Sequence, residues 1–277
     1  MEITHKFYEI PEDLSPLIKA IWHVNASGKA GEISPVQCCL PNGLTELIVN
    51  LKPQFKHYGE LNGARVVFPD AYMVGVMSEP VHWSMDAGTE LLGICFTPEA
   101  FVSIFNLSIS DIADRFERAD LFLGGMLGNL INQIRMASHH EQRQRFIVDY
   151  FRQRQINNEI RQPYFFQALE QIRLSSDALS LEEICGQVFV GKRQLQRAFQ
   201  DNLGVSLKTY GRILRFVRVY DSIYKNPNRK LTEIAHQFGY ADQSHFIREF
   251  REFTGDNPSA FLSDYQLDAN MPFVVRN

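Results

Sequence analysis

The chain has 277 residues, of which 45% are hydrophobic and 22% charged, and its formal net charge is −4. This length predicts two or three domains, and the composition is that of an ordinary globular protein. No apolar run reaches the roughly 18 residues of a membrane-spanning helix, and the first residues lack the basic-then-apolar order of a signal peptide. We therefore expect no membrane segment and a cytoplasmic location.

Residues 1 to about 96 have the pattern of a β-rich domain, because short apolar runs alternate with turn residues. The runs are 18–24, 44–51, 64–68, 72–76 and 90–96. Asn42-Gly43, Asn62-Gly63 and Gly88 stand before three of them and supply the positive φ that tight hairpins need. Several short strands at this spacing predict a barrel or a sandwich.

The period becomes helical from Pro98 to about Gln155. Pro98 suits a first helical turn with Thr97 as its cap, and Ser110 resembles a second capped start. Residues 127–134 carry one apolar stripe. A second apolar stripe, over residues 146–151, could pack on a partner subunit or on the chain's own barrel, and the sequence leaves both open.

Residues 156–163 are the best linker candidate, because they combine Asn157-Asn158 with Pro163. We therefore expect an N-terminal domain at residues 1–155, an all-helical domain at 164–265 and a tail at 266–277. The predicted fold class is α+β, with a β-rich, barrel-like domain and following helices placed before the helical domain.

Two stretches of the helical domain are copies of one pattern. The first reads Leu195-x-Arg197-x-Phe199-x-x-x-x-Gly204, and the second reads Phe246-x-Arg248-x-Phe250-x-x-x-x-Gly255. The match continues upstream, with an offset of 50 residues there and 51 residues downstream, so one residue is inserted at a turn. Each copy predicts a helix, a turn and a second helix that has an apolar inner face and an outward arginine.

The outward positions of the two second helices carry side chains that can read DNA. Arginine can bond guanine O6 and N7, glutamine can bond adenine N6 and N7, and a lysine near the helix start suits a phosphate. The candidate DNA-contacting residues are Lys192, Arg193, Gln196 and Arg197 in the first copy, and Gln243, Ser244, His245 and Arg248 in the second. The second helix also carries three acids, Asp242, Glu249 and Glu252, so we expect the first copy to supply more of the affinity.

Arg197 and Arg248 have a structural alternative, in which each holds an acid of the preceding helix. Packing does not require the same outward arginine in both copies, which favours the DNA interpretation. Between the copies lies a predicted helix at residues 206–224, with an apolar stripe that includes Leu214 and Val217. It would span about 27 Å, against about 34 Å between successive major-groove faces, so one subunit could touch two adjacent turns.

The sequence of residues 234–250, IAHQFGYADQSHFIREF, resembles the second-motif signature of the AraC/XylS family of bacterial transcription regulators. Residues 255–261 are similar to the ending of that signature. The resemblance covers the C-terminal hundred residues and implies seven helices, with two helix-turn-helix motifs joined by a long helix. It also implies that the outward residues of both motifs contact DNA. Cys185 and Gly191 depart from the Ala and capping Ser that are usual in the family.

The first 160 residues resemble the sensor half of some family members, through Pro41-Asn42-Gly43-x-x-Glu46-Leu47 and Gly93-x-x-Phe96-x-Pro98. That resemblance implies a domain that binds a small effector, dimerises, or both. RNA polymerase and a second copy of the chain are then candidate partners besides double-stranded DNA. Candidate effector-binding residues are Trp22, Tyr58, Tyr72 and Trp83, although we expect most aromatic side chains of this half to fill its core.

No motif predicts an enzyme, since no serine elbow, phosphate loop or pair of catalytic carboxylates stands in a credible context. The histidines lack metal-ligand spacing, and Cys38, Cys39, Cys95 and Cys185 fit neither a zinc site nor a disulfide framework, so we expect no metal and no cofactor. Two alternatives to a transcription regulator stay open. They are an enzyme with a DNA-targeting tail, and a ligand-binding module that uses its helices for protein contacts.

Overall fold

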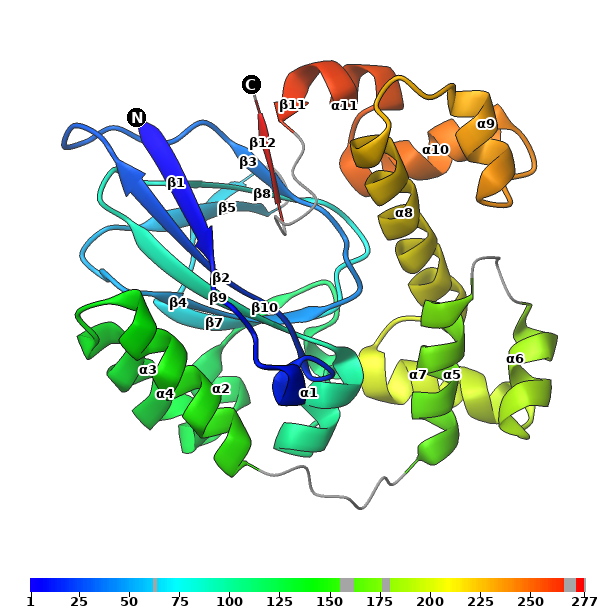
Figure 1. Ribbon diagram of the computed structural model, residues 1–277, viewed down its shortest axis with the longest axis horizontal. Coiled ribbons are helices and arrows are strands. Elements are labelled where there is room, and N and C mark those ends of the chain that lie inside the picture. Colours follow the sequence, from blue (N-terminus) through cyan, green and yellow to red (C-terminus); the bar gives the residue numbers. More distant parts are fainter. Residues whose placement is uncertain (62–63, 155–161, 176–179, 267–272, 277) are drawn as a thin grey trace. The chain divides into compact units, whose positions relative to one another are not determined.

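The computed structural model in Figure 1 describes residues 1–61, 64–154, 162–175, 180–266 and 273–276. Its contacts divide the chain into two compact units. The first unit consists of residues 1–35, 44–75 and 83–160, and the second of residues 36–43, 76–82 and 161–277. The predicted linker at 156–163 lies mostly outside the described residues, so that boundary stays a prediction.

A six-stranded antiparallel sheet forms the base of the first unit, in the order β1-β2-β9-β4-β7-β10. The strands are β1 (Glu2–Phe7), β2 (Ile18–Ser27), β4 (Thr45–Asn50), β7 (Ala71–Val74), β9 (Glu90–Phe96) and β10 (Phe116–Arg118). The order has two ends, whereas a closed barrel would pair β1 with β10. The β-rich domain is therefore confirmed, but within the described residues its sheet is not a closed barrel.

Three further strands of the N-terminal half are β5 (His57–Leu61), β6 (Ala64–Val67) and β8 (Val81–Met85). β5 pairs with β6 through Leu61 and Ala64, as the Asn-Gly pair between them predicts, although residues 62–63 lie outside the described part. Gly43 and Gly88 have the expected positive φ, 72° and 99°. The strand after Gly43 is β4, which pairs with β7 and β9, and the strand after Gly88 is β9, which pairs with β2 and β4. In the described sheets, neither strand pairs with the strand just before its turn, so these turns do not close tight hairpins.

The strands that the sequence missed are short or lack an apolar run. β1, for example, is mostly exposed and pairs only with β2 in the described sheet. In the second unit, β3 (Gln37–Cys39) pairs with β12 (Phe273–Arg276), which also pairs with β11 (Tyr265–Gln266). The predicted tail therefore contains strand residues, although no strand is predicted there.

The first helix after the sheet, α1 (Pro98–Phe105), begins as predicted, because the Ala100 amide donates to Thr97 Oγ1 at 3.2 Å. The helix predicted at Ser110 is only a 3-10 turn, Ser110–Ile112. No side chain caps it, and Asp114 has a φ of 53°, which leaves the helical region of the backbone.

The remaining helices of the first unit are α2 (Ala119–Phe122), α3 (Gly128–Met136) and α4 (His140–Gln153). The apolar stripe of α4 packs within its own unit. Phe151 is 2% exposed, and its ring centroid lies 5.3 Å from that of Phe96 on β9. Of the two alternatives for this stripe, the structure shows packing on the chain's own sheet, and Figure 1 shows α3 and α4 beside that sheet.

A cluster of charged side chains around Glu90, the first residue of β9, connects α4 to that strand. His23 Nε2 lies 2.7 Å from Glu90 Oε1, and Arg143 Nη1 donates to the same oxygen at 2.8 Å. Lys52 Nζ is 3.2 Å from the other carboxylate oxygen. The hydrogen bond from His23, followed by the hydrogen bond of Lys52 and the charge of Arg143, lowers the pKa of the Glu90 carboxyl to about 2.

We expect this carboxylate to make the first unit sensitive to acid. Its folded pKa lies below the usual value of about 4.3, so its stabilising effect is complete above that pH and is lost as the pH falls towards 2. Urea unfolding followed between pH 6 and pH 3 should show a smaller loss of stability for Glu90→Gln than for the wild type. The exposed Glu2→Gln is the control, and an unchanged pH dependence for Glu90→Gln would contradict the assignment.

Candidate nucleic-acid interface

The helical domain contains seven helices within its described residues, the number that the family resemblance implies. They are α5 (Pro163–Leu174), α6 (Leu181–Val188), α7 (Lys192–Leu203), α8 (Leu207–Lys225), α9 (Leu231–Gln237), α10 (Gln243–Thr254) and α11 (Pro258–Asp264). We call α7 the first reading helix and α10 the second. Helix α8 connects the two helix-turn-helix motifs, as Figure 1 shows.

Local capping determines where these helices begin and end. α6 begins with the predicted capping box, in which Ser180 and Glu183 exchange hydrogen bonds of 3.2 and 2.7 Å. At the start of α10, Asp242 accepts from the His245 amide at 2.7 Å. The repeated glycines Gly204 and Gly255 end α7 and α10 with a φ of 72° and 82°, which explains why both copies keep glycine there.

The turn between the helices contains one unexpected residue in the first motif. Phe189 ends α6 with a φ of 55°, and its side chain is 92% exposed. In the second motif the corresponding residue is Gly239, with a φ of 69°. A left-handed backbone strains a bulky residue but not glycine. The two motifs therefore make the same turn, but the first makes it at a higher conformational free-energy cost.

We expect Phe189→Gly to stabilise the helical domain by about 0.5–1 kcal/mol, because it removes a strain of about 1–2 kcal/mol and adds a smaller entropic cost. The exposed ring contributes little packing that would be lost. Gly239→Ala is the matched control and should destabilise by about 1 kcal/mol. Urea unfolding of the full chain measures both, and a less stable Phe189→Gly variant would contradict the interpretation.

The apolar residues of the repeat anchor both reading helices in the core. Leu195, Phe199, Phe246 and Phe250 are at most 1% exposed. The face of α8 differs from the prediction, because its buried residues include Ile213, Phe216, Val219 and Ile223. Leu214 and Val217, predicted to be in the stripe, are only half-buried. α8 packs on both motifs, so a single apolar stripe does not describe it.

The predicted DNA-contacting residues lie on the outer faces of the two reading helices. All are exposed except His245, which is half-buried and packs its ring edge-on against Tyr240. The structure thus brings them together as two groups, one on each reading helix. The first group is Lys192, Arg193, Gln196 and Arg197, and the second is Gln243, Ser244, His245 and Arg248.

Neither repeated arginine holds an acid of the preceding helix in the described residues. Arg197 pairs at 3.3 Å with Asp201 of its own helix, and the Arg197 side chain is 84% exposed. Arg248 Nε donates to the Ser244 carbonyl, also in its own helix, at 3.4 Å. An exposed pair of this spacing contributes only about 0.3–0.5 kcal/mol, so the Arg197 guanidinium is readily released. Lys192 does pair with the preceding helix, through Glu182.

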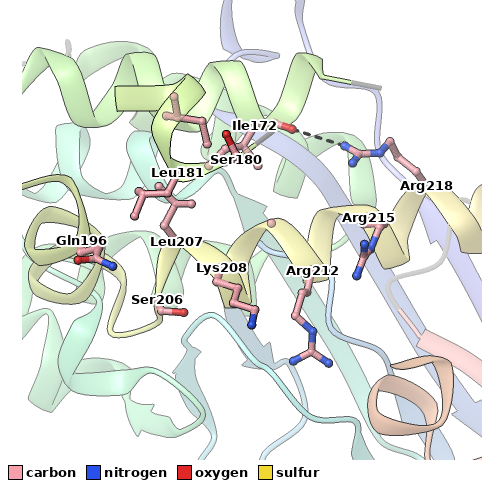
Figure 2. A pocket seen from close by; sticks show the side chains of 12 residues that line it. Ile172, Ser180, Leu181, Gln196, Ser206, Leu207, Lys208, Arg212, Arg215 and Arg218 are labelled. Carbon is pink, nitrogen blue, oxygen red and sulfur yellow. Dashed lines mark hydrogen bonds between the residues drawn. The ribbon is translucent and has the colours of Figure 1, made fainter. Parts of the chain in front are cut away.

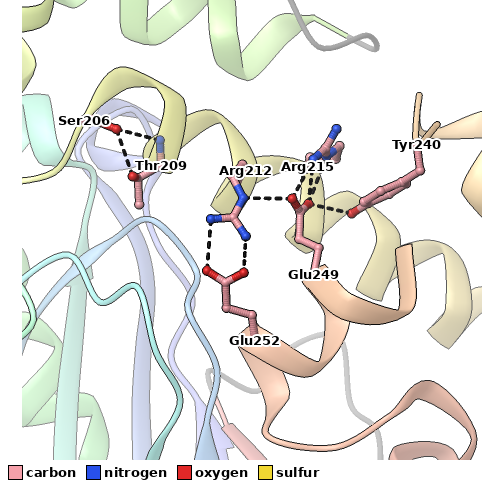
Figure 3. A network of polar contacts seen from close by, with 7 residues as sticks. All are labelled: Ser206, Thr209, Arg212, Arg215, Tyr240, Glu249 and Glu252. Atoms are coloured by element: carbon pink, nitrogen blue, oxygen red, sulfur yellow. Dashed lines mark hydrogen bonds and ion pairs between the residues drawn. The ribbon is translucent and has the colours of Figure 1, made fainter. Parts of the chain in front are cut away.

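All three acids of the second reading helix are engaged by the protein, and one of them, Glu249, is turned inward. Glu249 is 3% exposed and accepts hydrogen bonds from Arg212 and Arg215 of α8, as Figure 3 shows. Glu252 pairs with Arg212, and Asp242 caps α10. The expectation that the first motif supplies more of the affinity therefore loses much of its basis. The sequence missed this because Arg212 and Arg215 look solvent-facing on α8.

A basic groove of about 570 Å³ runs along α8 inside the helical domain (Figure 2). Its cationic side chains come from one face of α8, and Gln196 of the first reading helix also lines it. These cations are Lys208, Arg212, Arg215 and Arg218. The spacing of three or four residues between them places them on one helical face, which is the signal that could have found the groove.

The four candidate effector-binding residues all have partners inside the protein. Trp22 is 3% exposed and donates from Nε1 to Glu46 Oε1 at 2.7 Å. The Tyr72 hydroxyl lies 3.2 Å from His57 Nε2, and the Tyr58 hydroxyl donates to Asp86 at 3.0 Å. Trp83 is buried as well. Their binding of an effector stays a prediction.

A separate cavity of about 600 Å³ in the first unit is lined by none of these four aromatic residues. Its charged lining includes Lys56, Asp70, Arg118, Asp120 and Arg135. Lys56 pairs with Asp70, Arg118 pairs with Asp120, and Arg135 donates to two backbone carbonyls. These cations are therefore already engaged by the protein.

Across the described residues, no group of three His, Cys, Asp or Glu side chains is placed to hold a metal ion. The four cysteines are free thiols, and Cys38, Cys95 and Cys185 are buried. None of the described helices combines the length and apolar character of a membrane span.

Comparison with known proteins finds one family model in each half of the chain. A family model described as a helix-turn-helix domain matches residues 184–264, and that of a domain of unknown function, DUF6597, matches residues 7–118. YijO of Escherichia coli K12, an uncharacterized HTH-type transcriptional regulator, is 24% identical over 169 residues, which are 58% of this chain and 58% of that protein. The match therefore spans little more than half of that curated relative.

Two solved structures are similar to the chain at low identity. ToxT from Vibrio cholerae O395 has a TM-score of 0.44 and 12% identity, with 94% of this chain and 97% of that chain covered. A regulator with an AraC-type DNA-binding domain from Chromobacterium violaceum has a TM-score of 0.34 and 24% identity, with 39% of this chain and 96% of that chain covered.

Proposed function

We propose, on the premise that the chain belongs to the AraC family of helix-turn-helix transcription regulators, that it reads a specific double-stranded DNA sequence with α7 and α10. The N-terminal domain then controls this reader by sensing a small effector, by dimerising, or by both. RNA polymerase and a second copy of the chain are proposed partners.

One observation carries this proposal. Both reading helices are anchored by buried apolar residues at corresponding positions and present one arginine, Arg197 or Arg248, at the same outward position. Neither arginine is held by another helix in the described residues, so both guanidinium groups are available to a base edge. A shared scaffold with outward side chains that otherwise differ is what two unlike half-sites require.

The residues have distinct proposed roles. Arg193, Gln196 and Arg197 read bases in the first half-site, while Lys192 contacts a phosphate after exchanging Glu182 for it. Gln243, Ser244, His245 and Arg248 read the second half-site. α8 has 19 residues, so its length of about 28 Å separates the motifs by nearly one turn of DNA.

The proposal is tested by selecting duplexes from a random-sequence pool with the full-length protein and measuring their affinity at several salt concentrations. We expect enrichment of a duplex with two half-sites about ten base pairs apart. We also expect affinity to fall with salt, with a logarithmic slope of about −0.9 for each phosphate contacted. A protein that enriches no sequence would instead support a ligand-binding module whose helices contact proteins.

A further inference from the structure

The second reading helix carries a buried carboxylate, that of Glu249, which accepts hydrogen bonds from three side chains (Figure 3). Arg215 donates to both oxygens of Glu249 at 2.7 Å, and Arg212 Nε donates to Oε2 at 2.8 Å. The Tyr240 hydroxyl, from the turn before α10, donates to Oε1 at 2.9 Å. We call these four residues the Glu249 clamp.

The clamp joins two elements that are far apart in the chain. Arg212 and Arg215 belong to α8, whereas Glu249 and Tyr240 belong to the second motif. Both charges of this pair are largely shielded from solvent, because the Arg215 side chain is 11% exposed and that of Glu249 is 3% exposed. Arg215 also stacks its guanidinium on the Tyr240 ring, 4.2 Å from the centroid, which fixes its orientation.

The first motif has no such clamp, although it has the same scaffold. By the offsets of the repeat, Val190 corresponds to Tyr240 and Ala198 corresponds to Glu249. Both are apolar, and Ala198 is buried where Glu249 is buried. A helix-turn-helix of this kind therefore packs without a buried carboxylate. The acid in the second motif needs an explanation other than the packing of the motif itself.

The clamp stays charged at neutral pH. Burial would raise the pKa of the Glu249 carboxyl, but the hydrogen bonds of Arg212 and Arg215 lower it, and the net shift is downward. Bidentate arginine contacts are directional, and a buried ion pair whose partners are all satisfied can select one geometry among several packings. Apolar contacts such as those of Ala198 tolerate sliding more readily.

We propose that Glu249 is a positioning residue, which locks the second reading helix at one angle on α8 and so fixes the separation between the two half-sites that the protein accepts. This inference rests on the proposed function. Glu249 itself touches no DNA, and its effect on DNA is transmitted through the direction in which Arg248, its neighbour on α10, projects. The first reading helix, which has Ala198 at the corresponding position, keeps more freedom to change its angle on α8.

The test uses the duplex enriched by the wild-type protein and versions with one base pair inserted or deleted between the half-sites. Each base pair changes the separation by about 3.4 Å, so a rigid reader should lose about tenfold or more in affinity for either change. The variants are Glu249→Gln, which keeps the shape and removes the charge, and Tyr240→Phe, which removes one hydrogen bond. Glu170→Gln and Glu233→Gln are controls at exposed acids of α5 and α9, outside the clamp and the two reading helices.

We expect Glu249→Gln to bind the original duplex about tenfold more weakly and to discriminate about threefold or less between the three spacings. Footprinting should show that protection is lost at the second half-site and kept at the first. Tyr240→Phe should move in the same direction by less, and both controls should keep the wild-type discrimination. A purely structural role would weaken binding to all spacings equally, and that result would overturn the inference.

A second variant separates unfolding from loss of positioning. Arg215→Met with Glu249→Met replaces the buried pair by apolar side chains, which often preserves stability, and Arg212 keeps Glu252 as its partner. If this protein unfolds like the wild type yet no longer discriminates between spacings, the inference is supported. If it folds and discriminates like the wild type, the inference is wrong. A wild-type protein that selects no duplex would instead refute the proposed function.

Discussion

Replacing Arg197 and Arg248 together by alanine is expected to weaken binding to the selected duplex by between about 30-fold and 10⁴-fold. Each bidentate contact of an arginine with a base contributes about 1–3 kcal/mol of discrimination, and each 1.4 kcal/mol is a factor of ten. The weak pair between Arg197 and Asp201 offsets little of this. Gel shifts at a fixed salt concentration measure the loss.

The controls distinguish base reading from general electrostatics. Lys225→Ala removes an exposed charge at the end of α8 and should change the affinity for the duplex by less than about threefold. Lys192→Ala should reduce the salt slope by about one and weaken all sequences alike, as expected of a phosphate contact. The double arginine variant should instead relax sequence preference. If its affinity equals that of the wild type, the assignment of both arginines is wrong.

Trp22→Ala is expected to destabilise the first unit by about 3–5 kcal/mol. The indole is buried, it bonds Glu46, and it packs so closely on Gly93 that a Cβ there would lie 2.0 Å from it. The substitution leaves a cavity. It also leaves the Glu46 carboxyl, whose pKa is raised by burial, with the Cys95 thiol as its remaining bond in this cluster. Thermal unfolding measures the loss, which corresponds to about 6–20 °C.

This experiment also separates two interpretations of Trp22. A residue of the filled core should lower the unfolding temperature whether or not an effector is present. A residue that lines a binding site should leave the unfolding of the free protein unchanged and alter only the response to effector. Trp22→Phe is the matched control, because it keeps most of the ring volume, removes the N–H donor and should cost less than the alanine variant.

The helices of the DNA-reading domain could be predicted from the sequence because their determinants are local. The capping box at Ser180 and the glycines at Gly204 and Gly255 act within one or two turns of their own helix. The spacing of Leu195 and Phe199, repeated by Phe246 and Phe250, determines which face is buried. The recurrence of an arginine at the same outward position in both copies then indicates a shared role. The DNA-contacting roles of these residues stay predictions until binding is measured.

The two helix-turn-helix copies, their inner faces and their outward residues follow from the sequence, because helical periodicity and caps depend on neighbours a few positions away. That the N-terminal sheet has two ends is visible only in three dimensions, since closure depends on which distant strands meet. The same holds for the inward orientation of Glu249, because the arginines that neutralise it lie 34 and 37 residues earlier in the chain. A charge count along one helix cannot distinguish an acid that faces DNA from one that is bonded to a neighbouring helix.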